Sequence, residues 1–132
     1  MKLIVGITGS TGVIYGVRLL QALKEKKVQT HLILTEWAKK CLAMETDFTP
    51  DEVKSLATTV SDEANMAASV SSGTHKIDGM IVIPCTMKTL SSIAVGYDET
   101  LIARAAGVTL KESRKLILVP RETPLTAINL EN

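Results

Sequence analysis

A short turn bounded by glycines, Gly9-Ser10-Thr11-Gly12, follows an apolar run and precedes a helical pattern. Glycines let bare backbone amides approach an anion, and a helix N-terminus offers further free amides. With the hydroxyls of Ser10 and Thr11 added, the turn suits a mononucleotide phosphate or ribose. Its spacing matches neither G-x-G-x-x-G nor G-x-x-x-x-G-K-[ST], so NAD binding and ATP hydrolysis are not indicated. A tight turn that binds no ligand is the alternative interpretation.

A second polar segment, Pro84-Cys85-Thr86-Met87-Lys88-Thr89, follows another apolar run. Its hydroxyls, its ammonium group and the amides of the next helix are donors of the kind that flavin oxygens need. Lys88 is equally consistent with a solvated surface charge. Cys85 has no evident neighbouring base, so we expect a buried thiol rather than a nucleophile.

Charged residues near the end of the chain form a third candidate group. Arg121 and Glu122 follow the last apolar run, and Arg104 and Lys111 precede it. Arginine and lysine bind phosphate, and a nearby carboxylate can relay a proton. An ion-pair network on a helix surface is the alternative.

The remaining candidates lack partners. His31 and His75 have neither a second histidine nor a carboxylate at metal-ligand or triad spacing, so we expect structural roles and no metal site. Trp37 and Tyr15 could stack on a flavin ring, but lone aromatic residues near helix starts are more often packing residues. We therefore leave both outside the predicted site.

The elements that would position these residues alternate between strands and helices. Apolar runs predict strands at 3–7, 31–35, 80–83 and 115–119, and periodicity or capping signals predict helices at 13–26, 35–44, 50–58, 90–95 and 100–110, with a last one opening at Thr123-Pro124. The stretch 59–75 is small and polar, and we expect a long mobile loop there. This alternation predicts an α/β fold with a doubly wound parallel sheet, whose ligands sit beyond the carboxyl ends of the strands. The loops at 8–12, 35–37, 84–89 and 120–123 lie at that edge.

Length and composition narrow the class of protein. The 132 residues suit one domain, and a net charge of +1 gives no basic field for nucleic acid or an anionic membrane surface. No apolar run reaches the roughly 18 residues of a membrane span, and the two cysteines are too few for a disulfide framework. We expect a cytoplasmic protein whose partners are a small molecule or further copies of itself.

Several ordered segments resemble one family over essentially the whole chain. They are GITGSTGVIYGVRLLQAL, THLILTEWAKK, ETDFT, IPCTMKTLSSIAVGY, LIARAAGVTLKESRKLILVPRETPL and INLEN. Together they are similar to the UbiX-type flavin prenyltransferases, including the UbiX-like subunits of phenolic-acid decarboxylase systems. The resemblance implies a three-layer, Rossmann-like, flavodoxin-type sheet. It also implies that the protein transfers a dimethylallyl group from dimethylallyl monophosphate to reduced FMN, giving prenylated FMN for a UbiD-type decarboxylase.

The resemblance also implies roles for individual residues. FMN contacts are implied for Gly9, Ser10, Thr11, Thr35, Thr86, Met87, Lys88, Thr89 and Arg121, and catalytic roles at the prenyl phosphate and in proton transfer for Lys111 and Glu122. A large homo-oligomer, such as a dodecamer, is implied as well. Family members continue beyond INLEN, so residues 1–132 are expected to be one flavin-binding domain that lacks the usual C-terminal segment, with FMN binding retained and transfer weak or absent.

Two other functions remain open. The chain could be a non-catalytic FMN-binding subunit of an aromatic-acid decarboxylase system. It could also take part in decarboxylation directly, although no residue is evidently suited to stabilise an aryl carbanion.

Overall fold

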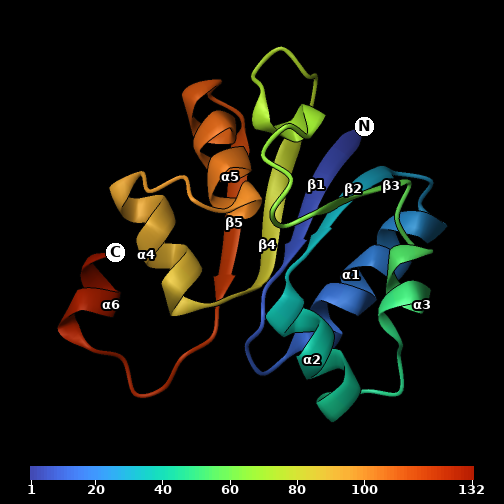
Figure 1. Cartoon of the computed structure of the whole chain (residues 1–132), viewed down its shortest axis with the longest axis horizontal. Coiled ribbons are helices and arrows are strands. Elements are labelled where there is room, and N and C mark those ends of the chain that lie inside the picture. Colours follow the sequence, from blue (N-terminus) through green and yellow to red (C-terminus); the bar gives the residue numbers. More distant parts are fainter.

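Five parallel strands form a single sheet in the computed structural model, which describes all residues from 1 to 132 (Figure 1). They are β1 (Lys2–Ile7), β2 (Gln29–Leu34), β3 (Thr59–Asp62), β4 (Gly79–Cys85) and β5 (Lys115–Pro120). Their order is β3-β2-β1-β4-β5, and every neighbouring pair is parallel. The chain winds outward from β1 in one direction and from β4 in the other. A topological switch point therefore lies between β1 and β4, where ligands of such sheets bind.

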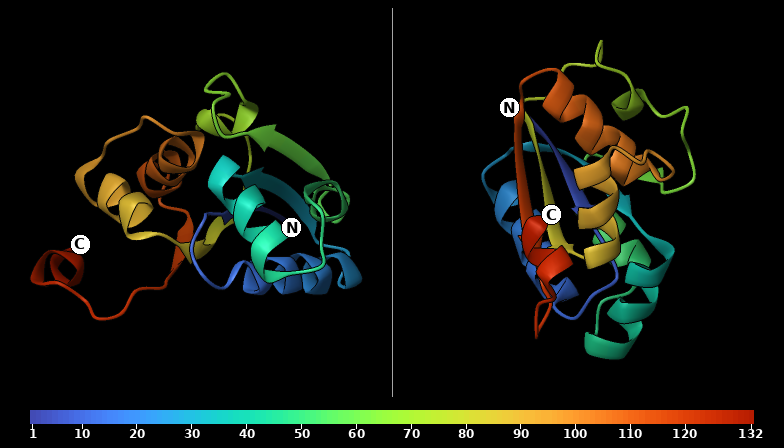
Figure 2. Two further views of the ribbon diagram at one scale, coloured as in Figure 1. Left: turned by 60° about the horizontal axis from the view of Figure 1, so that its bottom comes forward. Right: turned by 90° about the vertical axis from the view of Figure 1, so that its left-hand side faces the viewer.

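Helices complete the fold on both faces of the sheet. They are α1 (Val13–Glu25), α2 (Glu36–Glu45), α3 (Pro50–Lys54), α4 (Met87–Val95), α5 (Leu101–Lys111) and α6 (Ala127–Glu131), with a 3₁₀ turn, η1, at Ser69–Ser71. Figure 2 shows α1 and α5 on opposite sides of the sheet. The predicted three-layer, doubly wound α/β architecture is confirmed.

Each face of the sheet has its own apolar core, because side chains of a strand alternate between the two faces. Val5 and Ile7 of β1 pack with α1, α2 and α3, whereas Ile4 packs with β4, η1 and α5. Both groups are almost fully buried. Burial on both faces explains why these strands appear in the sequence as continuous apolar runs rather than alternating ones.

Helix starts follow from capping chemistry. Threonine side chains accept a hydrogen bond from the third amide of α2, α3, α4, α5 and α6. The exception is α1, whose N-cap is Gly12 with φ 105° and no side-chain cap. That left-handed conformation requires glycine, so the chain turns sharply from β1 into α1.

Three expectations about individual elements need correction. Residues 59–75 are not one loop: residues 59–62 form edge strand β3, and η1 follows, because backbone pairing with β2 outweighs a polar composition. The helix at Pro50 ends at Lys54 rather than near Thr58. Strand β4 does not stop at Pro84 but continues to Cys85 through a register irregularity between β4 and β5.

The outer strand β5 is covered on one face only. Leu116 and Leu118 pack against the core, whereas Ile117 and Val119 are 45% and 38% exposed on the other face. Helix α6 stands apart from the sheet at the end of the chain, near α4 (Figures 1 and 2). None of the helices combines the length and the hydrophobicity that a membrane span requires.

Candidate active site at the carboxyl edge of the sheet

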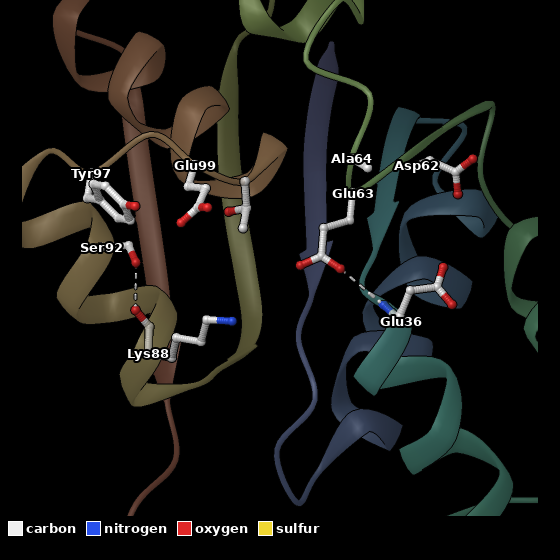
Figure 3. Close-up of a pocket in the computed structure, with 9 residues that line it drawn as sticks. Glu36, Asp62, Glu63, Ala64, Lys88, Ser92, Tyr97 and Glu99 are labelled. Atoms are coloured by element: carbon white, nitrogen blue, oxygen red, sulfur yellow. Dashed lines mark hydrogen bonds between the residues drawn. The ribbon is translucent and has the colours of Figure 1, made fainter.

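A cleft lies at the carboxyl ends of the central strands, at the switch point. One part of it is a cavity of about 490 Å³, lined by Thr8, Gly9, Thr35, Glu36, Trp37, Lys40, Glu63, Thr86, Lys88, Thr89, Ser92 and Thr100. A neighbouring cavity of about 580 Å³ shares five of these residues and adds Asp62, Ala64, Tyr97 and Glu99 (Figure 3). The two cavities form one cleft between the first turns of α2 and α4 and the end of β3.

Three threonines in this cleft are helix N-caps. The hydroxyls of Thr35, Thr86 and Thr100 accept hydrogen bonds from Ala38, Thr89 and Ala103 amides at 3.1–3.2 Å, which starts α2, α4 and α5. The positive ends of three helix dipoles therefore meet at the cleft. An electron-rich or anionic ligand is favoured there.

Thr8 joins the two central strands at this edge. Its hydroxyl donates to the Pro84 carbonyl at 2.6 Å and accepts from the Thr86 amide at 2.9 Å. Only 2% of the residue is exposed. The first residue after β1 thus fixes the turn between β4 and α4, and with it the cavity floor.

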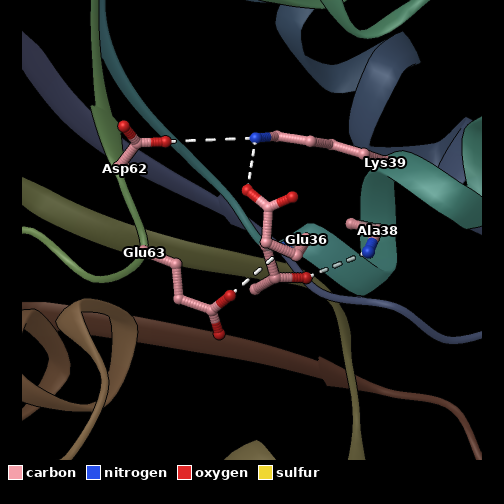
Figure 4. A network of polar contacts seen from close by, with 6 residues as sticks. Glu36, Ala38, Lys39, Asp62 and Glu63 are labelled. Atoms are coloured by element: carbon pink, nitrogen blue, oxygen red, sulfur yellow. Dashed lines mark hydrogen bonds and ion pairs between the residues drawn. The ribbon is translucent and has the colours of Figure 1, made fainter.

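Acidic side chains line the opposite wall. Glu63, just after β3, accepts a hydrogen bond from the Glu36 amide at 3.2 Å, and Lys39 bridges the carboxylates of Glu36 and Asp62 (Figure 4). The hydrogen bond with Lys39 lowers the pKa of Glu36, and the same bond raises the pKa of Lys39. This network ties edge strand β3 to the first turn of α2.

The structure brings together five of the residues predicted for the site. Gly9, Thr35, Thr86, Lys88 and Thr89 come from three separate loops and line the same cavity. Their meeting follows from the parallel sheet, which places the ends of β1, β2 and β4 side by side. Met87 lies in the first turn of α4 between two lining residues, but it is not among the residues that line the cavity.

Ser10 and Thr11 lie in the turn beside this cavity and do not line it. Thr11 is exposed. The Ser10 hydroxyl is shielded from solvent and has no hydrogen-bond partner, which is uncommon for a buried polar atom. An acceptor or donor supplied by a ligand would satisfy it.

Arg121 and Glu122 follow β5 at the carboxyl edge but are exposed and do not line the cleft. The Arg121 amide donates to the Cys85 carbonyl at 3.4 Å, so this loop starts next to the β4–α4 turn. The Glu122 carboxylate accepts from the Thr123 amide at 3.0 Å. Neither side chain hydrogen-bonds to the five residues gathered in the cavity.

Lys111 lies at the opposite edge of the sheet. It is the last residue of α5, and the chain then enters β5 at Lys115, beside the amino end of β4. Eleven helical residues separate the two ends of α5 by about 16 Å. Arg104, on the same helix, bonds Asp98 and the Ser71 carbonyl. Within one chain, Lys111 is therefore not part of the cleft.

The thiol and imidazole groups have structural environments. Cys85 is fully buried, and this burial raises the pKa of its thiol to about 11. His31 is buried between the hydroxyls of Thr59 and Ser61, and burial lowers its pKa. No group of three or more His, Cys, Asp or Glu side chains is arranged to hold a metal ion.

Comparison with known proteins gives consistent matches. A family model described as Flavoprotein matches residues 1–131. A probable UbiX-like flavin prenyltransferase of Escherichia coli O157:H7 is 55% identical over all of this chain and 68% of its own length. The mitochondrial flavin prenyltransferase PAD1 of Saccharomyces cerevisiae is 51% identical over 99% of this chain and 54% of its own.

The chain belongs to the flavoprotein family, among its UbiX-like flavin prenyltransferases.

Two solved structures of UbiX-like proteins superpose closely on this flavoprotein. One is a dodecameric FMN-dependent UbiX-like decarboxylase from Escherichia coli O157:H7, with TM-score 0.97 and 55% identity over 99% of this chain and 71% of the other. The second is AnUbiX (PadA1) in complex with FMN and dimethylallyl pyrophosphate, with TM-score 0.97 and 48% identity over 98% of this chain and 69% of the other. The chain thus spans roughly half to seven tenths of the proteins that it matches.

The cleft of this UbiX-like chain fits FMN on structural grounds. The uncapped start of α1 and the unpartnered Ser10 hydroxyl suit a phosphate, and the Thr35 and Thr100 hydroxyls keep their protons free to donate. Lys88 adds a positive charge to the cavity that Thr35 and Thr100 line. The donor set therefore matches an anionic, oxygen-rich ligand.

Sequence reasoning missed several residues of this UbiX-like cleft. Thr8, Trp37, Lys40, Glu63 and Thr100 line the cavity but were not predicted as site residues. Thr8 and Trp37 lie within the loops predicted at that edge, but the expectation that Trp37 is a packing residue outside the site is wrong, because its indole is 56% exposed and lines the cavity. Glu63 gave no signal, because it follows a strand that the sequence does not show.

Proposed function

We propose that this chain is a flavin prenyltransferase, which joins a dimethylallyl group from dimethylallyl monophosphate to reduced FMN. The observation that carries the proposal is the cleft at the switch point, where three helix amino ends, Lys88 and the glycine turn meet. The relatives with the same fold, one of them bound to FMN and dimethylallyl pyrophosphate, support it.

The residues of the cleft divide the binding of FMN between them. Gly9, Ser10 and Thr11 surround the phosphate with amides and hydroxyls at the start of α1. Thr35 and Thr86, already held as N-caps, meet the polar edge of the ring system. Lys88 offsets negative charge on the bound flavin, with Met87 and Thr89 packed beside it.

In the proposed reaction, the bond between the dimethylallyl carbon and the phosphate oxygen breaks, and the same carbon, with cationic character, forms a new bond to the flavin. Reduced FMN supplies the electron-rich ring that accepts the dimethylallyl carbon. Arg121 stabilises the negative charge that grows on the leaving phosphate, and Glu122 holds or moves a proton beside it. Lys111 contributes to the phosphate site only from a neighbouring copy, because its own cleft lies at the other edge of the sheet.

A homo-oligomer follows from this arrangement as part of the proposal. The dodecameric relative from Escherichia coli supports it. We further propose a UbiD-type decarboxylase as the recipient of prenylated FMN.

Location in the cytoplasm stays a prediction, and fractionation of cells that produce the protein would test it.

FMN binding without transfer is the second candidate function. It is favoured by one observation: neither proposed catalytic residue, Lys111 or Glu122, lines the cleft of a single chain. A chain of this kind would hold FMN as a subunit of an aromatic-acid decarboxylase system.

One experiment separates these functions. The protein is incubated anaerobically with reduced FMN and dimethylallyl monophosphate, and the mass of the extracted flavin is measured. A gain of one prenyl unit supports transfer, and bound but unmodified FMN supports the second candidate. Release of CO₂ from an aromatic acid by the protein alone would favour direct decarboxylation. A protein that retains no FMN contradicts all three functions.

A further inference from the structure

Trp37 is a large aromatic side chain that stands on the wall of the cavity instead of in a core. It is the second residue of α2 and is 56% exposed, whereas Ala38, Cys41 and Leu42 of the same helix are buried. Among the twelve residues that line the 490 Å³ cavity, Trp37 is the one hydrophobic side chain. An aromatic ligand in this cavity therefore finds a single apolar surface.

The indole is held in place despite its exposure. A Cβ atom built on Gly9 would lie 2.7 Å from both Cβ and Cγ of Trp37, which is closer than real side chains approach. The position accepts glycine because the tryptophan packs directly against the backbone of the β1–α1 turn. From α2, the Lys40 ammonium lies 5.0 Å from the centre of the indole ring, within range of a cation–π contact.

Gly9 therefore has a second reason to be glycine. The left-handed conformation that requires glycine in this turn belongs to Gly12, and no such conformation is found at Gly9. What excludes a side chain at Gly9 is the position of Trp37. The β1–α1 turn, which suits a phosphate, and the indole of Trp37, which suits an aromatic ring, are therefore held together by the contact between Gly9 and Trp37.

We propose that Trp37, seated on Gly9, contacts the flavin ring and determines selectivity for phosphates that carry an aromatic ring. The inference rests on the proposed function, because FMN supplies both the phosphate and the ring. Aromatic contacts of this kind contribute about 0.5–1.5 kcal/mol, which corresponds to about 2- to 12-fold in affinity.

The first test compares ligands and matched variants. Trp37→Leu should bind FMN about 3- to 10-fold more weakly by equilibrium dialysis, and should bind ribose 5-phosphate within 2-fold of the parent. Tyr15→Leu is the control: Tyr15 is 66% exposed near the same turn but does not line the cavity, so FMN affinity should not change. Equal FMN affinity in Trp37→Leu and the parent overturns the ring contact.

The second test examines the seat of the indole without any ligand. Trp37 is the single tryptophan of the chain, so intrinsic tryptophan emission reports on this position alone. Gly9→Ala should displace the indole and shift its emission to longer wavelength, with unchanged far-UV circular dichroism. An unshifted spectrum overturns the Gly9–Trp37 contact.

A double variant then assigns the role of Gly9. Gly9→Ala should weaken FMN binding in the parent but change it by less than 2-fold in the Trp37→Leu background, where the added methyl group meets a smaller side chain. Equal losses in both backgrounds would show that the methyl group meets FMN directly, which contradicts the inference. If the parent binds no FMN, the proposed function fails too. If the parent binds FMN and Trp37→Leu binds it equally, only this inference fails.

Discussion

Threonine is the most frequent side chain in the cavity, and most of its threonines hold backbone as well as facing the ligand space. Thr8 fixes the turn after β4, and Thr35, Thr86 and Thr100 each start a helix. The hydroxyls of Thr35 and Thr100 only accept a hydrogen bond and keep their protons free to donate, whereas Thr8 already donates to the Pro84 carbonyl and Thr86 to the Thr89 hydroxyl. The ligand therefore meets donors whose positions were set by folding, which lowers the entropic cost of binding.

The glycine turn makes a prediction for Thr11, the exposed residue before Gly12. Thr11→Glu should weaken FMN binding by about 10-fold, because a carboxylate would face the phosphate across a few ångströms of partly solvated space. Thr11→Gln, with nearly the same shape and no charge, is the matched control and should bind FMN within about 3-fold of the parent. Equilibrium dialysis at low ionic strength is the measurement. Equal affinity of Thr11→Glu and the parent would place the phosphate elsewhere.

The Cys85 thiol should be unreactive in the folded protein, both as a nucleophile and toward thiol reagents. Burial raises the pKa of its thiol to about 11, so less than about 1% is thiolate at pH 8. Cys85→Ser should keep FMN binding and any transfer activity. In the folded Cys41→Ser protein, thiol-reactive reagent should label Cys85 far more slowly than after unfolding. Loss of turnover in Cys85→Ser, with normal FMN affinity, would contradict this view.

At the scale of elements, the edge strand β3 is the least expected part of the fold. Its residues Thr59 and Ser61 direct hydroxyls to the two ring nitrogens of His31 on β2, at 2.7 and 2.9 Å. The strand then delivers Asp62 and Glu63 to the cleft. A buried imidazole thus helps to position one wall of the candidate site.

This arrangement predicts acid sensitivity. Burial, followed by the charges of Lys2 and His75, lowers the pKa of His31 below 6.5, so the folded state binds fewer protons than the unfolded state in that range. Stability is then complete above about pH 6.5 and falls as the pH drops toward the folded-state pKa, by up to about 1.4 kcal/mol per pH unit. The free energy of unfolding in urea between pH 7.5 and 5 measures it.

His31→Gln is the informative variant for this pH dependence. It should flatten the slope while lowering stability at pH 7.5, because one buried hydrogen bond is lost. His75→Gln changes a less buried imidazole, whose pKa is also lowered by burial, and should keep most of the slope. A slope as steep in His31→Gln as in the parent would assign the acid sensitivity to other groups.

The sequence predicted the central elements better than the edge. Strands β1, β2, β4 and β5 are buried on one or both faces and appear as apolar runs, so their existence was predictable. Strand β3 contains one apolar residue, Val60, which is exposed. It exists because β2 offers a free edge at that point, and this long-range pairing leaves no local pattern.

At the scale of the whole molecule, the predicted site residues are divided between the carboxyl ends and the amino ends of the strands. Residues that follow β1, β2 and β4 meet in the cleft, which the doubly wound topology alone predicts. Lys111 is close to Arg121 in the sequence, yet a complete strand lies between them, so they occupy opposite edges. Residues close together along the chain can therefore lie at opposite ends of the strands.

The separation makes a prediction for two lysines. Lys88→Ala should weaken FMN binding about 5-fold, with a smaller effect in high salt, because a partly solvated charge is removed from the cavity. Lys111→Ala should leave FMN affinity unchanged in a dilute, monomeric sample, since α5 holds it about 16 Å away. Weaker binding in Lys111→Ala under those conditions would show that the residue reaches the cleft within its own chain.

The shared position of Thr35, Thr86 and Thr100 has a consequence for how the molecule moves. The amides that these residues cap are the ones that open first when a helix frays. A ligand that engages the hydroxyls would hold the first turns of α2, α4 and α5 closed at the same time, although the three helices are separate in sequence. Hydrogen exchange should therefore slow together at Ala38, Thr89 and Ala103 when FMN binds, while exchange at the opposite ends of these helices keeps its rate.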